Sequence, residues 1–172
     1  MKILSSREVY QCGVFRVTED EAEEPGGFRI RRSVVRHRGS AVMLAVDAKG
    51  RALLVRQYRL PAEKSLWELP AGSLDPGEKP LAGAKRELRE ETGYHARQWK
   101  KLVSYWPSPG FVSEKMHVFL ARDLVAGDAQ PMEDERIECR WFAPRELDAL
   151  IRQGKIEDGK TLIGFMLWQR YR

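Results

Sequence analysis

The sequence has few of the features that mark secreted, membrane-bound or cysteine-ligated metal proteins. It contains two cysteines, Cys12 and Cys139, and no CxxC motif, so we expect neither a disulfide framework nor a zinc site. The same scarcity of cysteine leads us to expect a cytoplasmic location. It has no run of 18 apolar residues, so we expect no membrane span, and its first residues lack the apolar segment of a secretory signal. The three histidines show no metal-binding spacing.

The composition is that of an ordinary globular protein that is somewhat rich in charge. The chain has 172 residues, 42% hydrophobic and 32% charged, which is enough for one domain with a small extension. The formal net charge of +5 suits an anionic small molecule. Nucleic acid is not the expected partner, because we find no long basic patch with interleaved aromatic residues.

Short strands and a few helices alternate along the chain, which predicts an α+β fold. The first two strands are expected at 9–20 and 28–37, separated by the turn-prone acidic stretch 19–27. The segments 40–47 and 51–59 flank the tripeptide AKG, which predicts a second hairpin. A loop rich in glycine and proline follows at 67–80. Further strands are expected at 101–106, 115–124 and 135–142, and further helices at 144–154 and 161–172.

The segment from Pro80 to about Thr92 predicts an acidic helix. Proline is favoured at the first helical position, and Gly93 suits the position after the last turn. On this helix Glu87, Glu90 and Glu91 share one face, and like charges at that spacing cost a few tenths of a kcal/mol per pair. Two interpretations stay open: a solvated helix with salt bridges to cations such as Arg86, or a carboxylate face that binds a hard divalent cation.

The residues around this helix carry a longer pattern. In GSLDPGEKPLAGAKRELREETGY (72–94) a glycine, a glutamate and the REL-EE-G run occur at fixed intervals: Gly72, Glu78, Arg86, Glu87, Leu88, Glu90, Glu91 and Gly93. This string resembles the signature of the Nudix hydrolases, and departs from it only at Tyr94, where an aliphatic residue is usual. The resemblance implies an α/β/α sandwich over 39–172, with a mixed sheet between helices. It also implies a small antiparallel β extension over 1–38 that serves as a dimerisation element.

The resemblance also implies a cofactor and a reaction. Nudix enzymes use Mg²⁺ or Mn²⁺, and the matching ligands here are Glu87, Glu91 and Glu90, with the backbone carbonyl of Ala71. Glu78 and Arg86 match the charge network that shapes the loop. The reaction is hydrolysis of a diphosphate linked to another moiety, in which metal ions neutralise the diphosphate and activate water.

Four other segments narrow the substrate. LLVRQYR (53–59), WELPAG (67–72), SPGFVSE (108–114) and KTLIGFMLW (160–168) resemble the ADP-ribose pyrophosphatases of that family, with Pro109 at a matching position. This implies a homodimer that splits ADP-ribose into AMP and ribose 5-phosphate. The alternatives are another nucleoside diphosphate sugar as substrate, a Nudix module that binds without catalysis, and RNA recognition. SPGFVSE taken alone also fits a plain tight loop.

The general base and the substrate contacts lie outside the signature, so no fixed spacing places them in the sequence. The subgroup usually takes its base from a loop near the end of the domain, here QPMEDERIE (130–138), which points to Glu135, with Glu133 as the alternative. Glu114 is predicted to contact a ribose or a metal-bound water. Arg56 would contact a phosphate if it points into the cleft, and would be a surface residue if it points outward.

The basic stretch 29–38 and three aromatic residues complete the candidates. Strand alternation places Arg29 and Arg31 on one face, and one face of this stretch could reach a diphosphate across a dimer; a solvated face is the other interpretation. Candidates for stacking on an adenine, each of which also suits a core or loop anchor, are Trp67, Phe28 and Trp106.

Overall fold

The computed structural model describes residues 1–128 and 136–170. It contains three sheets, with strand orders β1-β2-β3, β10-β5-β6 and β7-β4-β9-β8. The strands are β1 (Lys2–Gln11), β2 (Phe15–Glu23), β3 (Arg29–His37), β4 (Ser40–Ala45), β5 (Ala52–Arg59), β6 (Lys64–Glu68), β7 (Ala71–Ser73), β8 (Tyr94–Tyr105), β9 (Met116–Ala126) and β10 (Glu138–Phe142). The helices are α1 (Pro80–Thr92), α2 (Pro144–Arg152) and α3 (Gly159–Arg170), with a short 3₁₀ turn at Leu60–Ala62.

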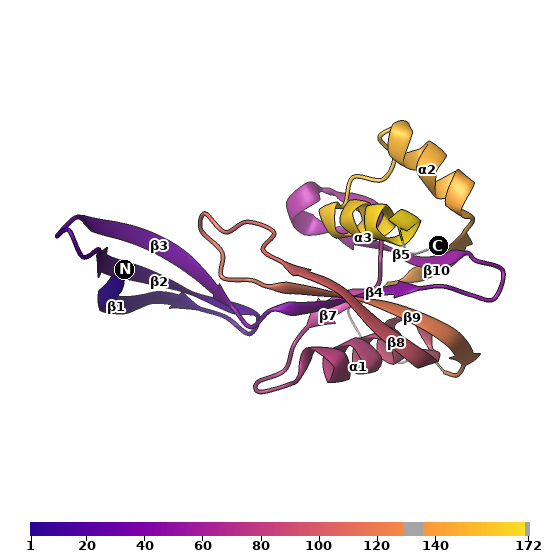
Figure 1. The fold of residues 1–172 in the computed structure, drawn as a ribbon, viewed down its shortest axis with the longest axis horizontal. Helices are drawn as coiled ribbons and strands as arrows, with labels where there is room; N and C mark the ends of the chain where they lie inside the picture. Colours follow the sequence, from indigo (N-terminus) through magenta and orange to yellow (C-terminus); the bar gives the residue numbers. More distant parts are fainter. Residues whose placement is uncertain (129–135, 171–172) are drawn as a thin grey trace.

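Strand β4 is the centre of the main body. All six of its residues are buried, and it pairs parallel to β9 and antiparallel to β7. Alternate side chains enter two cores, as the period of a strand requires. Val42 and Leu44 pack with Trp168 of α3, whereas Ala41 and Met43 pack with Leu88 of α1. The mixed sheet therefore lies between α1 and α3 (Figure 1), and the predicted α/β/α sandwich is confirmed.

Strands β1 to β3 form an antiparallel sheet that projects from this body as an arm (Figure 1). The prediction of a single strand over 9–20 was wrong, whereas the predicted hairpin forms with a shorter turn, at 24–28, between β2 and β3. The chain also turns earlier, between β1 and β2, and Glu19, Glu21 and Glu23 lie within β2. Arginines on the neighbouring strands explain this, because Arg7 pairs with Glu19 and Arg29 pairs with Glu23 at 2.6 and 2.9 Å.

The predicted hairpin over 40–47 and 51–59 was also wrong. β4 and β5 belong to different sheets, and the bridge Val46–Ala52 is their pairing at the turn. β4 takes the partners β7 and β9, which are distant in sequence, whereas β5 pairs with the distant β10 and with β6, which follows it after a short turn. The local pattern of two apolar strands around a turn fits either a hairpin or two strands in different sheets. Burial against partners elsewhere in the chain decided between them.

The signature helix was predicted closely. α1 begins at Pro80 and ends at Thr92, and Gly93 follows with a left-handed φ of 73° while its amide donates to Arg89 O. The loop expected at 67–80 holds the end of β6 and all of β7. Within the described residues, no helix has the length and apolarity needed to cross a membrane.

Candidate active site

A single guanidinium organises the carboxylates of the signature. Arg86 Nη1 donates to Glu87 Oε1 at 2.7 Å and to Glu90 Oε2 at 2.9 Å. On the loop side, Nε and Nη2 donate to the two oxygens of Glu78 at 3.1 and 2.9 Å. Nη2 also donates to the carbonyl oxygen of Ser73 at 3.1 Å. Arg86 therefore holds the helix and the preceding loop in one arrangement.

The charges in this network do not balance. Asp75, at 3.6 Å from Arg86, joins Glu78, Glu87 and Glu90, so four carboxylates share that guanidinium, although Arg89 also approaches Glu90 at 3.7 Å. The hydrogen bonds from Arg86 lower the pKa of Glu78 against the opposing effect of burial, and the same contacts raise the pKa of Arg86. Four carboxylates therefore lie within ion-pair distance of the one guanidinium of Arg86, an arrangement that suits a further positively charged ligand.

Glu91 lies beside this network and is the most buried of the signature carboxylates, at 4% exposure. The amide of Ala71 donates to Glu91 Oε2 at 3.1 Å, which joins the end of α1 to the start of β7. On its other side, Cys139 Sγ lies 3.8 Å from the backbone carbonyl of Glu91. Burial raises the pKa of the Cys139 thiol, and the nearby Glu91 carboxylate adds to this.

Gly72 lies in close contact with the side chain of Glu87. A Cβ at this position would overlap the carboxylate of Glu87, because β7 passes directly beside the side chain. The cradle formed by the Ala71–Gly72 backbone, Glu87, Glu90 and Glu91 offers carboxylate and carbonyl oxygens, the donors that Mg²⁺ and Mn²⁺ prefer. These residues fit a hard divalent cation chemically. Within the described residues, no set of three or more acidic, histidine or cysteine side chains is already arranged as a metal cage.

A second buried ionic network supports the segment before the signature. Glu68 is 1% exposed and accepts two hydrogen bonds from Arg59, at 2.9 and 2.8 Å, and one from Lys160 of α3. Asp158 accepts from Lys160 and Thr161, and Thr161 Oγ1 accepts from the amide of Leu69 at 2.7 Å. Sequence reasoning missed this network. The available signal was a lone glutamate inside the apolar run WELP.

The predicted substrate residues on β5 and β6 form a cross-strand row. Arg56 pairs with Glu138 in register at 3.7 Å and lies over the ring of Trp67 at 5.9 Å. Trp67 packs edge-on against Phe142, with ring centroids 5.0 Å apart, at the margin of the core. The structure thus favours the core-anchor interpretation of Trp67, and places Arg56, half exposed, on the sheet beside Cys139.

The other predicted substrate residues lie toward the arm. Arg31 is exposed on β3, opposite Glu21. Pro109 lines a groove against the arm, and its loop is tied there by Val35, whose amide donates to Phe111 O at 2.8 Å. Glu114 accepts from Ser40 Oγ at 2.6 Å. Glu135 and Glu133 lie outside the described residues, so the assignment of the base stays a prediction.

His37, which the sequence had given no role, connects the arm to the signature. Its Nδ1 accepts from the amide of Gly39 at 3.0 Å, and its own amide donates to Ser113 Oγ at 3.0 Å. Its Nε2 is 3.4 Å from the hydroxyl of Ser73, the residue whose carbonyl binds Arg86. A chain of contacts therefore runs from the loop 108–114 through His37 to the carboxylate network.

The fold and the carboxylate network around Arg86 together point to one family of proteins. The model of the NUDIX domain family matches residues 35–163, and the chain belongs to this family, which confirms the resemblance seen in the signature.

Particular relatives and a solved structure extend the comparison. The "Methanol dehydrogenase activator" of Bacillus methanolicus is 35% identical over 98% of this chain and 92% of its own length. The "ADP-ribose pyrophosphatase" of Bacillus subtilis (strain 168) is 35% identical over 93% of this chain and 88% of its own. A crystal structure of an "ADP compounds hydrolase" superposes with a TM-score of 0.83 at 23% identity, covering 99% of this chain and 94% of that one, and supports the fold.

Proposed function

We propose that this protein is a hydrolase that uses Mg²⁺ or Mn²⁺ to split the diphosphate of ADP-ribose into AMP and ribose 5-phosphate. The observation that carries the proposal is the excess of carboxylates around Arg86, beside the backbone of Ala71 and Gly72. Buried and partly buried carboxylates that outnumber their cations are costly unless a cation binds there. The name of the Bacillus subtilis relative supports ADP-ribose as the substrate.

The roles of the chain's own residues follow from their positions. Glu87, Glu90 and Glu91, with the Ala71 carbonyl, would hold the metal ions. When bound, the metal would neutralise the diphosphate and lower the pKa of a coordinated water. Arg86 and Glu78 keep the helix and loop in register, so that the carboxylates are already positioned before substrate arrives. Glu135, or Glu133 as the alternative, would accept the proton of the attacking water.

The remaining predicted residues are assigned to the substrate. Arg56 would bind a phosphate, and its partly exposed guanidinium beside Glu138 is accessible for this. Glu114 would contact the ribose or a metal-bound water. Arg31 and Pro109 lie on the arm side, so they would reach substrate only from a partner subunit. Trp67 would stack on the adenine only through the part of its ring that is exposed.

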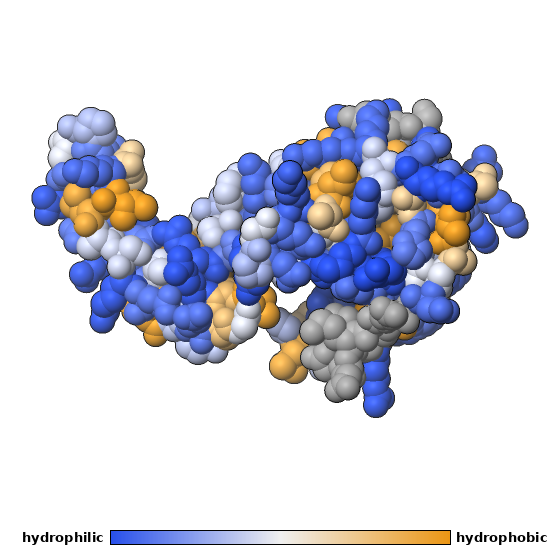
Figure 2. Space-filling view, turned by 90° about the horizontal axis from the view of Figure 1, so that it is seen from below, coloured by the Kyte–Doolittle hydropathy of each residue, from blue (hydrophilic) through white to orange (hydrophobic). Residues whose placement is uncertain are grey.

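We propose that the protein acts as a homodimer in the cytoplasm, with residues 1–38 as the dimerisation element and 39–172 as the catalytic domain. The arm exposes many apolar side chains among its charged ones (Figure 2), including Ile3, Val9, Tyr10, Val14 and Phe28 at 47–60% exposure. A second copy would cover them. Multi-angle light scattering should give twice the mass of one chain; the mass of a single chain at micromolar concentration would refute the dimer.

The function is tested by turnover with Mg²⁺ on a panel of substrates, with the nucleoside monophosphate product measured directly by chromatography. The panel holds ADP-ribose, ADP-glucose, GDP-mannose, UDP-glucose, a dinucleoside polyphosphate and NADH, each with an EDTA control. We expect an EDTA-sensitive preference for ADP-ribose. Preference for another nucleotide sugar would keep the chemistry and change the substrate. Binding of these compounds without turnover would favour a non-catalytic module, and a salt-dependent gel shift with generic RNA tests nucleic-acid recognition.

A further inference from the structure

A cavity lies at the end of β4 opposite the backbone of Gly72, and Tyr94, which follows the signature helix, forms part of its wall. It has a volume of about 970 Å³, within the range of ligand sites. Its lining comes from the turn 46–51, residues 122–124 of β9, and the rings of Tyr94, Trp141 and Trp168. β4 separates the two places: Ala41 pairs with Gly72 of the signature, and Val46 borders the cavity. At about 3.3 Å per residue these ends are about 17 Å apart. We call this cavity the distal pocket.

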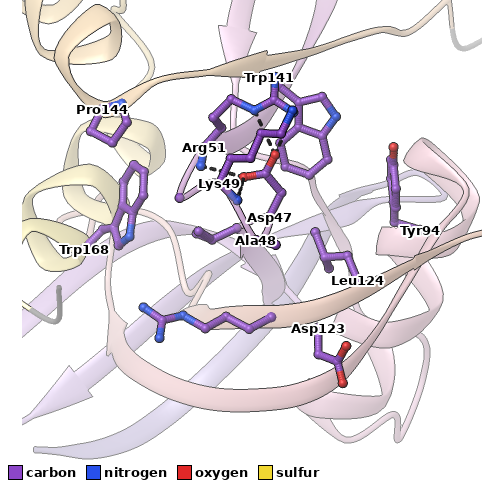
Figure 3. A pocket seen from close by; sticks show the side chains of 13 residues that line it. Asp47, Ala48, Lys49, Arg51, Tyr94, Asp123, Leu124, Trp141, Pro144 and Trp168 are labelled. Carbon is purple, nitrogen blue, oxygen red and sulfur yellow. Dashed lines mark hydrogen bonds and ion pairs between the residues drawn. The ribbon is translucent and has the colours of Figure 1, made fainter.

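Aromatic rings make one wall of the distal pocket. Tyr94 and Trp141 meet edge to face with centroids 5.5 Å apart, and the guanidinium of Arg51 lies 5.7 Å from the Trp141 ring. Figure 3 shows Trp168 and Pro144 on the side opposite Tyr94, so that the labelled rings flank the opening. Trp168 itself is only 1% exposed and belongs to the core. Tyr94 and Trp141 are partly exposed, and such rings are surfaces on which a flat aromatic group can stack.

The charges that line the distal pocket are positive once internal pairs are counted. Asp47 accepts from the amides of Lys49 and Arg51 at 3.0 and 2.8 Å, and from Arg51 Nε at 2.8 Å (Figure 3). These contacts fix the turn and neutralise Arg51. Asp123 lies 3.9 Å from Arg97. Among the described residues, no ion pair engages Lys49 or Arg122, which leaves two cations facing the cavity.

The backbone of β9 has an uncommon conformation at Asp123, which also lines the distal pocket. Asp123 has φ of 54°, a left-handed conformation inside β9, and it stands between Arg122 and Leu124, which both line the cavity. Aspartate tolerates this conformation better than most residues, and such conformations cluster at ligand sites. This observation does not depend on the charges or the rings, and it marks the same place.

We propose that the distal pocket binds a small anion that carries a flat aromatic ring, of the nucleoside monophosphate class. Lys49 and Arg122 would pair with the phosphate, and the wall of Tyr94 and Trp141 would stack the base. Tyr94 directly follows Gly93, where the signature helix ends, so an occupant would touch the residue next to that helix. The proposal concerns binding alone and does not depend on the proposed hydrolysis, since it is tested without metal or turnover.

The test is isothermal titration calorimetry with AMP in EDTA, on the full chain. We expect AMP to bind, and the double variant Lys49→Ala/Arg122→Ala to weaken its Kd by at least about 10-fold, because two charge-assisted contacts are lost. The control Arg152→Ala/Lys155→Ala removes two exposed positive charges near the end of α2, outside the pocket, and should leave Kd unchanged. Adenosine and inorganic phosphate alone should each bind at least about 10-fold more weakly than AMP.

Three results would overturn the proposal. One is no heat with AMP at several millimolar. Another is AMP binding whose Kd the pocket variant Lys49→Ala/Arg122→Ala leaves unchanged, since this would place the ligand elsewhere on the protein. The third is adenosine binding as tightly as AMP, because the cations would then have no role. If the double variant does not fold, as judged by circular dichroism, the single variant Arg122→Gln replaces it with the same expected direction.

Discussion

The arm and the signature are both dense in ion pairs, yet the pairs differ in kind. On the arm, Arg7 pairs with Glu19, and Arg29 pairs with Glu23 and more distantly with Glu21, all on exposed strands. At the signature, four carboxylates share Arg86, and Glu91 is buried beside them. Exposed, balanced pairs contribute little to stability. The signature set is more buried, apart from the exposed Asp75, and a set of carboxylates crowded around one cation is what the proposed cation site would require.

The largest effect should come from the buried signature carboxylate. Glu91→Gln keeps an acceptor for the Ala71 amide but removes the charge, so the fold should persist while kcat falls by about 10³-fold, as expected for loss of several kcal/mol of metal stabilisation. Mg²⁺-dependent turnover of ADP-ribose measures this. Glu19→Gln on the arm is the matched control. Near-normal turnover of Glu91→Gln would remove Glu91 from the metal site.

A second prediction concerns the close approach at Gly72. A methyl group in Gly72→Ala would push the carboxylate of Glu87 away, and displacements near 1 Å can cost about 10²-fold in rate. We expect kcat to fall by about that factor while the circular dichroism spectrum is retained. Gly26→Ala on the arm is the control, because an added Cβ there meets open space. Equal activity of the two variants would contradict the cradle.

A third prediction compares stability. Glu68→Gln leaves Arg59 and Lys160 without their buried carboxylate, which should lower the free energy of unfolding by about 3 kcal/mol. For a chain of this length that corresponds to a fall in Tm of about 6–12 °C. The exposed pair gives the contrast: Glu23→Gln should cost less than about 1 kcal/mol. Differential scanning calorimetry of both variants decides, and similar costs would erase the distinction between the regions.

The smallest expected effect is a pH dependence. Arg86 lowers the pKa of Glu78 below its ordinary 4.5, so this carboxylate stabilises the fold above that pH and loses its contribution as the pH falls through the lowered pKa. The Tm difference between the wild type and Glu78→Gln should be full at pH 7 and should shrink steadily below about pH 4.5. A difference that grows toward acid pH would reverse the assigned sign.

The elements predicted well were those fixed by local signals. Pro80 and Gly93 gave the ends of α1 because proline and glycine restrict or release the backbone at single positions. The same local reasoning failed for 40–59, where β4 and β5 resemble a hairpin and join different sheets. It also placed the acidic stretch 19–23 in a turn, because the arginines that stabilise it in β2 come from other strands.

Some features of the candidate site also follow from local sequence, whereas others depend on the tertiary structure. The grouping of Glu87, Glu90 and Glu91 on one face follows from the helical period, and the spacing to Gly72 and Glu78 identified the family. The approach of Gly72 to Glu87, the hydrogen bond from Ala71 to Glu91 and the link through His37 join distant segments. No local pattern could reveal them.

The sequence by itself determined which carboxylates share a helical face and which family the chain belongs to. The tertiary structure decided what surrounds them. It brought β7 against Glu87, buried Glu68 between Arg59 and Lys160, and opened the distal pocket at the other end of β4. The reason is physical, since helix periodicity acts over a few residues, whereas burial and strand pairing select partners from the whole chain.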